Sequence, residues 1–384
     1  MVPYIVMALV LVLAVWVGHL WQQINVVSGI ASGTAASGTG PGAAGPGLGS
    51  GAPAGSDAGD PSAVVARVSP GLVDITTTLG YANGQAAGTG IVLTPDGEVL
   101  TNNHVIEGAT EIAVTDIGTG HSYPATVVGY DRSHDIAVLA LQGASGLPTP
   151  VLADSSSARV GDAVIAIGNA GGVGGAPSAA PGKITGIGRS VTASDQVDGT
   201  SEQLTGLVQV NADLQPGDSG GALVNSAGEV IGVDTAASTG FQVEQTGGQG
   251  FAIPINQALD IARQIESGVG SSAVHVGPTP ILGIQAQDFS VAIGRHHRQF
   301  TQQSVYPASG ALVSGVMSGS PAAQAGLFEG DLITSLDGHT VDSTTTLSDL
   351  LGLHHPGDQV TLGWLDSAGQ QHTEIVQLVT GPAA

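Results

Sequence analysis

The sequence predicts a mainly β protein with more than one domain, and three observations support this prediction. Its 384 residues, 42% of them hydrophobic, are enough to build a core for each of two or three domains. Glycine is abundant, with 60 residues, whereas aromatic residues make up only 3%, a composition that favours short strands and turns. From residue 61 onward, short β-branched runs alternate with turn residues, as they do in β-barrels and β-sandwiches.

Residues 1–25 are predicted to be a signal or membrane-anchor segment. Residues 2–17 are apolar throughout, which is long for the core of a signal peptide and slightly short of the about 20 residues that a spanning helix needs. No lysine or arginine precedes Arg67, so charge gives no orientation. We therefore expect an extracytoplasmic protein, membrane-anchored or secreted, and favour the anchored form because aromatic residues flank the apolar run.

Residues 26–60 are predicted to form a linker. From residue 28 they are almost wholly glycine, alanine, serine, threonine and proline, with no periodicity and little bulky apolar surface. Such a segment cannot offset the conformational entropy that folding would cost, so we expect a flexible tether to the domains that follow.

The first globular domain is predicted over residues 61–268. It contains a hairpin over residues 90–101 that turns at Pro95-Asp96-Gly97. Asn256 is expected to cap a helix near the end of the domain, and Gly268 to terminate it. Further strands are expected at residues 111–115, 125–130, 136–141, 163–167, 206–210, 222–225 and 230–235.

Charge and residue content exclude several classes of function. Eight basic residues against 31 acidic ones give a net charge of -23, which repels phosphate backbones and anionic lipids, so no nucleic-acid partner is expected. The chain has no cysteine and therefore no disulfide or thiolate chemistry. The pairs His296-His297 and His354-His355 lack the spacing of a metal site, so we interpret them as solvated loop histidines and expect neither metal nor cofactor.

A serine in a glycine-rich turn is the strongest candidate for catalysis. Residues 216–221, Pro-Gly-Asp-Ser-Gly-Gly, place Ser219 between two predicted strands, and the glycines let the amides of Gly217 and Ser219 point toward one oxyanion. A serine nucleophile needs a base, and the base needs an orienting carboxylate. His104 follows one predicted strand directly and Asp135 directly precedes another, so both groups are available.

The order and flanks of these residues resemble those of a known family. Thr-Asn-Asn-His-Val-Ile at 101–106, His-Asp-Ile-Ala-Val-Leu at 134–139 and then the serine turn resemble the chymotrypsin-like serine proteases. Among these the chain is most similar to the HtrA family, in particular to its actinobacterial PepA-type members. The resemblance implies a double β-barrel in which His104 is the general base, Asp135 fixes its tautomer and Ser219 is the nucleophile.

Two residues depart from the usual pattern of that family. Asp218 stands where the family usually has asparagine; in animal trypsins an aspartate there pairs with a new N-terminus released by cleavage. The first residue lies far away behind the linker, so we expect Asp218 to hydrogen-bond locally or to pair with an arginine, unless processing occurs near Asp60. Asp213 stands where trypsins carry the acid that selects lysine or arginine. It is a candidate for the specificity pocket, against a pocket for small aliphatic side chains as in the HtrA family.

Residues 279–380 resemble a PDZ domain of the HtrA type. Leu282-Gly283-Ile284 matches the loop that binds a peptide carboxylate, residues 320–327 match the short helix, and residues 330–338 match the following hairpin. The resemblance implies that C-terminal peptides bind here as an added strand, with their carboxylate held by backbone amides around Gly283. The alternative is a domain that only supports the protease.

Together these features predict a serine endopeptidase that cleaves unfolded or extended polypeptides through an acyl-enzyme, in extracytoplasmic protein quality control or processing. The alternative is a chaperone or PDZ scaffold that holds unfolded proteins without cutting them. A third alternative, a structural wall protein, is supported only by the glycine-rich linker. Members of the HtrA family often trimerise, so a homo-oligomer is an open alternative, although no residue of this sequence requires it.

Overall fold

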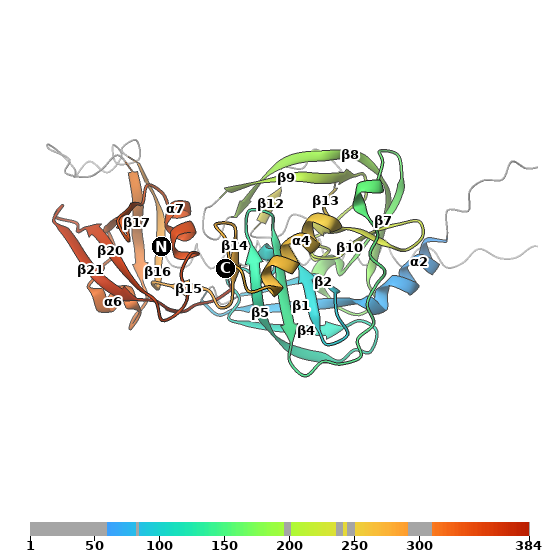
Figure 1. Ribbon diagram of the computed structural model, residues 1–384, viewed down its shortest axis with the longest axis horizontal. Coiled ribbons are helices and arrows are strands. Elements are labelled where there is room, and N and C mark those ends of the chain that lie inside the picture. The colour runs from blue at the N-terminus through green and yellow to red at the C-terminus, as the bar shows by residue number, and fades with distance from the viewer. Residues whose placement is uncertain are drawn as a thin grey trace, which may run out of the picture. The chain divides into compact units, whose positions relative to one another are not determined.

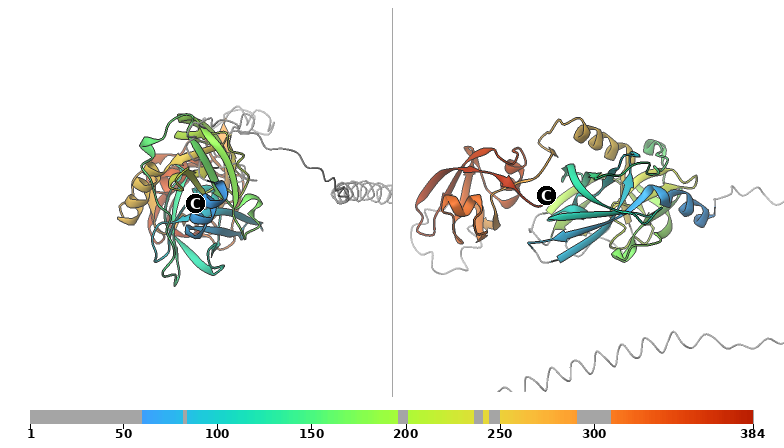
Figure 2. Two further views of the ribbon diagram at one scale, coloured as in Figure 1. Left: turned by 90° about the vertical axis from the view of Figure 1, so that its right-hand side faces the viewer. Right: turned by 90° about the horizontal axis from the view of Figure 1, so that it is seen from below.

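The computed structural model describes residues 60–81, 84–195, 201–235, 241–243, 250–290 and 309–383 (Figure 1). The predicted N-terminal segment and all of the predicted linker except its last residue lie outside them. Among the described residues, no helix is long and apolar enough to cross a membrane. The described chain consists mostly of strands, as the sequence predicts (Figures 1 and 2).

Helix α2, Pro61–Val68, opens the described chain. The side chain of Asp60 caps the helix by accepting a hydrogen bond from Ser62 N, and proline at the first helical position has no amide that needs a partner. Val64 and Val68 bury one face of α2 in the largest hydrophobic core. The short 3-10 helix η1, Ser69–Gly71, then leads into the first strand.

The first β-barrel is formed by β1 to β6. Its antiparallel strand order is β5-β4-β1-β2-β3-β6, and pairing of β5 with β6 closes the sheet on itself. The predicted hairpin is present, with Ile91 opposite Leu100 and Gly97 at φ +100° in the turn. The strands are β1 Leu72–Leu79, β2 Gly84–Val92, β3 Glu98–Thr101, β4 Glu111–Asp116, β5 Ser122–Asp131 and β6 Ile136–Leu141; helix α3, Asn103–Ile106, follows β3, and β14, Val274–Val276, pairs with β5.

The second β-barrel has the strand order β8-β7-β10-β11-β13-β9, and pairing of β8 with β9 closes it. Strand β12 adds to the outer edge of β8. The strands are β7 Ala163–Gly168, β8 Ser178–Asp195, β9 Ser201–Val210, β10 Ala222–Asn225, β11 Val230–Thr235, β12 Phe241–Val243 and β13 Gly250–Pro254; the short helices η2, Ser155–Ser157, and η3, Ala170–Gly172, precede and follow β7.

Strand β8 is the longest element among the described residues, and it is missing from the sequence-based prediction. Its 18 residues include glycine, proline and several alanines, which have low strand propensity. Pairing with β7 on one side and β9 on the other supplies its backbone hydrogen bonds. Tertiary pairing therefore overrides local propensity along this strand.

Helix α4, Ile255–Glu266, ends the two-barrel unit and packs against β5, β6 and β11. Its buried residues include Ala262 and Ile265. The prediction that Asn256 caps the helix is wrong, because Pro254 is the capping residue and Asn256 lies inside the first turn. The Asn256 amide instead donates to Asp154 Oδ1 at 2.7 Å. Gly268, at φ +71°, follows the helix end as predicted.

The C-terminal domain contains a sheet with the order β16-β17-β18-β20-β21, so β16 is an edge strand. Its separate core contains Trp364, Leu282 and Leu347. Serine caps begin the two helices among the described residues of this domain, at Ser320 and Ser343. The elements are β15 Pro280–Ile281, β16 Ile284–Ser290, β17 Ser309–Val316, α6 Pro321–Ala325, β18 Leu332–Leu336, β19 His339–Thr340, α7 Thr344–Leu351, β20 Gln359–Leu365, β21 Gln371–Gln377 and β22 Val379–Thr380.

Candidate active site

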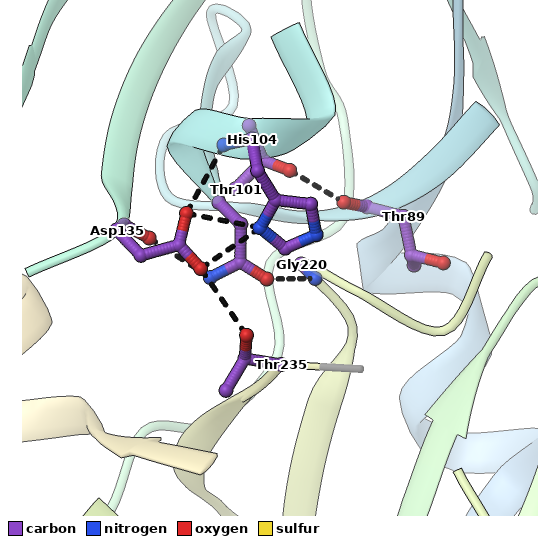
Figure 3. A network of polar contacts seen from close by, with 7 residues as sticks. Thr89, Thr101, His104, Asp135, Gly220 and Thr235 are labelled. Atoms are coloured by element: carbon purple, nitrogen blue, oxygen red, sulfur yellow. Dashed lines mark hydrogen bonds and ion pairs between the residues drawn. The ribbon is translucent and has the colours of Figure 1, made fainter. Parts of the chain in front are cut away.

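His104 and Asp135 meet at the ends of strands of the first barrel. Strand β3 ends at Thr101 and α3 begins two residues later, which places His104 in the first turn of that helix. Asp135 lies just before β6 with φ +54°, a left-handed conformation that aspartate tolerates better than most residues. His104 Nδ1 lies 3.0 Å from Oδ1 and 2.9 Å from Oδ2 of Asp135 (Figure 3).

The Asp135 carboxylate accepts from two further donors. The backbone amide of His104 donates to Oδ1 at 3.0 Å, and the Thr235 hydroxyl donates to Oδ2 at 3.1 Å (Figure 3). Asp135 is only 2% exposed. Because a carboxylate only accepts, Nδ1 of the neutral imidazole carries the proton and Nε2, on the other side of the ring, is left to accept one.

Asn102 joins the histidine segment to the serine turn. Its Nδ2 donates to the carbonyl of Asp135 at 2.9 Å, and its Oδ1 accepts from Gly220 N at 2.7 Å. Asn102 is fully buried. Because Asn102 lies two residues before His104 and Gly220 directly follows Ser219, this one side chain ties together the segments of the candidate base and nucleophile.

The serine turn depends on its glycines. Gly217 has φ +100° and Gly220 has φ +80°. A Cβ at Gly217 would collide with the carbonyl oxygen of Asn169, and one at Gly220 with the carbonyl oxygen of Thr89. Ser219 is buried, and its carbonyl accepts from Thr89 N at 2.8 Å. A side chain at either glycine would therefore displace the turn that carries the serine.

Asp218 forms local hydrogen bonds, which confirms the first of the two expectations for it. Its Oδ1 accepts from the Ser178 hydroxyl at 2.7 Å and its Oδ2 accepts from Gln215 N at 2.8 Å. Burial raises the pKa of Asp218 above its ordinary value, although these two hydrogen bonds lower it. The carboxylate is thus bound by the first residue of β8 and by the backbone of its own turn.

Asp234 is a second buried acid beside the serine turn. It is fully buried at the end of β11. Its backbone carbonyl accepts from Gly220 N at 2.8 Å. Burial raises the pKa of Asp234 well above its ordinary value, and the nearby charge of Asp218 adds to the effect. The serine turn therefore packs on a buried acid whose pKa is raised.

Asp213, the candidate for the specificity pocket, lies in the segment between β9 and the serine turn. It is exposed, and its charge contributes to the raised pKa of Asp218. Its place in a substrate pocket stays a prediction.

A second aspartate–histidine pair, Asp131 and His134, lies directly before Asp135 in the sequence. His134 Nδ1 is 2.7 Å from Oδ2 of Asp131, and this hydrogen bond raises the pKa of His134. Asp131 is buried, whereas His134 is partly exposed. His134 is therefore the partner of Asp131, although it lies next to Asp135 in the sequence. The histidine that contacts Asp135 is His104.

In the C-terminal domain, the predicted carboxylate-binding loop is a tight turn before β16. Gly283 has φ +76°, and a Cβ there would collide with the side chain of Ser320. The carbonyl of Leu282 accepts from Ala322 N, and the carbonyl of Gly283 accepts from Met317 N, both at 3.0 Å. With these carbonyls bound inside the domain, the loop is held rigidly where β16 starts at Ile284.

Of the two histidine pairs, only His354-His355 lies among the described residues. His296 and His297 lie outside the described residues, whereas His354 Nε2 is 3.3 Å from Asp337 Oδ2. Across the described ranges, no group of three or more histidine, aspartate or glutamate side chains is placed to hold a metal ion.

Four buried polar residues around the site escaped the sequence-based prediction: Thr89, Thr101, Asn102 and Thr235. Threonine is common in strands, so its presence there is no functional signal by itself. A usable signal was the pair of asparagines before His104, because polar residues that end an apolar strand need partners.

Comparison with known proteins gives the same two domains. The trypsin-like peptidase domain family matches residues 88–233, and the PDZ domain family matches residues 312–365. The serine protease PepD of Mycobacterium tuberculosis is 34% identical over 341 residues, which cover 85% of this chain and 67% of PepD. The periplasmic pH-dependent serine endoprotease DegQ of Escherichia coli is 35% identical over 294 residues, 76% of this chain and 59% of DegQ.

The two barrels and the following domain thus define a trypsin-like peptidase domain joined to a PDZ domain. The chain belongs to the HtrA-type family of trypsin-like serine proteases. The solved structure of the HtrA-type protease AlgW with a tripeptide is 29% identical, with a TM-score of 0.46 over 85% of this chain and 99% of AlgW. The chain spans 59% of the length of DegQ and 56% of that of DegP of the same organism. Both the predicted family and the predicted fold class are confirmed.

Proposed function

We propose that this protein is an extracytoplasmic serine endopeptidase that cleaves unfolded or extended polypeptides through an acyl-enzyme. The observation that carries the proposal is the contact of His104 Nδ1 with both oxygens of the buried Asp135, tied through Asn102 to the turn that holds Ser219. A histidine held in this way can act as a general base, because its Nε2 lies on the side of the ring away from Asp135.

The proposed reaction has two halves with balanced proton transfers. The Ser219 hydroxyl attacks the substrate carbonyl carbon as His104 Nε2 takes its proton; the C–N bond then breaks, and the same proton passes to the leaving amine. In the second half, water attacks the ester carbonyl while His104 takes its proton. The C–O bond to Ser219 then breaks, and His104 returns the proton to the serine oxygen. The amides of Gly217 and Ser219 are proposed to bind the oxyanion in both halves.

Reaction with a fluorophosphonate probe tests this proposal. Wild-type protein is expected to form one phosphonyl-serine adduct per chain, located at Ser219 by peptide mass spectrometry, and to lose proteolysis of a reduced, unfolded protein in proportion. A chaperone or scaffold would bind the same unfolded protein and show neither adduct nor fragments. Labelling at another serine would reject the assignment of Ser219.

The PDZ domain is proposed to bind C-terminal peptides along β16. This strand has a partner only on its β17 side among the described strands, so its other edge is available for an added strand. Asp288 of β16 accepts hydrogen bonds from the amide and hydroxyl of Thr344, both at 2.7 Å, and so holds the start of α7 beside the strand. Strand and helix would form the two walls of the peptide site.

Two glycine-to-alanine variants test this site. Gly283 and Gly319 share φ +76°, so alanine costs similar backbone strain at both. Only at Gly283 does the added Cβ meet a neighbour, the side chain of Ser320, because the space at Gly319 is open. Gly283→Ala is expected to weaken binding of a C-terminal peptide by roughly tenfold or more relative to Gly319→Ala, measured by fluorescence anisotropy. Equal binding by both variants would argue against the loop.

The N-terminal segment is proposed to direct the chain across a membrane and to remain as an anchor. The support is its apolar run and the names of DegQ and DegP, which are periplasmic proteins. Cell fractionation distinguishes this from release, since a wholly soluble mature protein would contradict the anchor.

A further inference from the structure

We propose that Thr89 is a positioning residue of this peptidase, whose hydroxyl holds the backbone around Gly217 in the orientation that forms the oxyanion hole. The inference rests on the proposed function. Thr89 lies in β2, in the first barrel, whereas Gly217 lies in the serine turn of the second.

All polar groups of Thr89 are engaged. The hydroxyl donates to the carbonyl of Gly217 at 2.8 Å and accepts from Asn169 N at 2.9 Å. The backbone amide donates to the carbonyl of Ser219 at 2.8 Å, and the carbonyl accepts from the Thr101 hydroxyl at 2.7 Å (Figure 3). Thr89 is fully buried, so water does not compete for these bonds. One residue thus contacts the serine turn twice.

The amide that would bind the oxyanion is held through the carbonyl of its own peptide. The planar unit between Pro216 and Gly217 directs its N–H and C=O to opposite sides. The carbonyl of Pro216 accepts from Gly171 N at 2.7 Å, so the amide of Gly217 points away from the segment that contains Gly171. A glycine at φ +100° resists rotation only weakly by itself, so these carbonyl contacts decide the orientation.

The Thr89 hydroxyl acts on both peptide units that flank Gly217. It binds the carbonyl of Gly217 directly. It also fixes Asn169, whose carbonyl accepts from Gly172 N at 2.8 Å and so closes the turn that presents Gly171 to Pro216. Removal of this hydroxyl would directly free the peptide unit that contains the Gly217 carbonyl. It would also loosen the unit between Pro216 and Gly217, because the turn at Asn169 would lose its contact with Thr89.

Three variants distinguish loss of the Thr89 hydroxyl from general damage to the fold. Thr89→Val keeps the shape and the backbone bonds but loses the hydroxyl, and Thr89→Ser keeps the hydroxyl. Thr77→Val is the matched control, because Thr77 is equally buried in the neighbouring β1 but its hydroxyl makes only a 3.4 Å contact with the carbonyl of Ala86. The measurements are kcat and KM for a peptide reporter, and inhibition by a peptide aldehyde whose hemiacetal oxygen would occupy the oxyanion hole. Circular dichroism verifies folding; Thr89→Ala replaces Thr89→Val if the latter does not fold.

Thr89→Val is expected to lower kcat by roughly 10- to 100-fold, somewhat less than the loss that follows deletion of an oxyanion donor itself. KM should stay nearly unchanged, and aldehyde inhibition should weaken by the same factor as kcat. Thr89→Ser should recover most of the activity, and Thr77→Val should match the wild type.

Several results would overturn the inference. They are wild-type kcat in Thr89→Val, a loss confined to KM, unaltered aldehyde inhibition, or a Thr89→Ser variant as impaired as Thr89→Val. If the wild-type protein itself reacts neither with a fluorophosphonate nor with peptides, the proposed function has failed and this inference falls with it. An active wild type with an unaffected Thr89→Val rejects the inference alone.

Discussion

Replacement of Ser219 by alanine is expected to lower kcat by about 10⁴-fold or more, and His104→Ala is expected to do the same. In the proposed reaction, no acyl-enzyme forms without Ser219, and no group takes the serine proton without His104. Because both residues act in one step, the double variant should be scarcely worse than either single variant. Hydrolysis of an unfolded protein, followed by mass spectrometry of the fragments, measures all three.

His134→Ala is the control for the histidine. His134 also pairs with a buried aspartate and lies next to Asp135 in the sequence, but its partner is Asp131. Its removal should leave kcat close to that of the wild type. A large loss in His134→Ala together with an active His104→Ala would show that the wrong histidine has been chosen. A double variant far worse than the single ones would contradict a shared mechanism.

The second large effect is expected for Asp135→Asn, with a loss in kcat on the order of 10⁴-fold. An amide can present its NH₂ group to His104 Nδ1, which would move the imidazole proton to Nε2, where it blocks proton transfer from the serine. The structure adds a further cost. The amide of His104 and the hydroxyl of Thr235 donate to different oxygens of Asp135, and an asparagine side chain has only one.

Asp131→Asn is the matched control for that variant. Asp131 is as buried as Asp135 and accepts from its own histidine, so the substitution has the same chemistry four residues away. It should affect stability more than kcat. Equal losses of kcat in the two asparagine variants, with thermal unfolding unchanged, would indicate a general effect of the loop and not a tautomer effect at His104.

The sequence-based prediction succeeds where short-range pattern decides the structure. Strands β6, β10 and β11 lie at the predicted residues because their apolar runs are bounded by turn residues. It fails for β8, whose glycines and alanines carry no strand signal and whose order comes from pairing with neighbours far away in the chain. Asn256 fails for a related reason, since its side chain is used by Asp154, about a hundred residues earlier.

The same division holds at the site. The residues expected to carry the chemistry lie in recognisable local motifs, and the contact of His104 with Asp135 is present in the structure. The polar partners of these residues are spread over the chain: Thr235 contacts Asp135 across 100 residues and Thr89 contacts Gly217 across 128. The sequence pattern does not predict such contacts, because threonine is also common in strands that have no functional role.

The division of the site between two barrels has a consequence during biosynthesis. His104 and Asp135 belong to the first barrel, whereas Ser219 and Thr235 belong to the second. A chain in which only the first barrel has folded would therefore hold a base without a nucleophile until the second barrel has folded and docked. An enzyme for unfolded polypeptides would otherwise meet its own unfinished half as the nearest substrate. Under the proposed function, assembly of the site from both barrels would delay activity until the second barrel has folded.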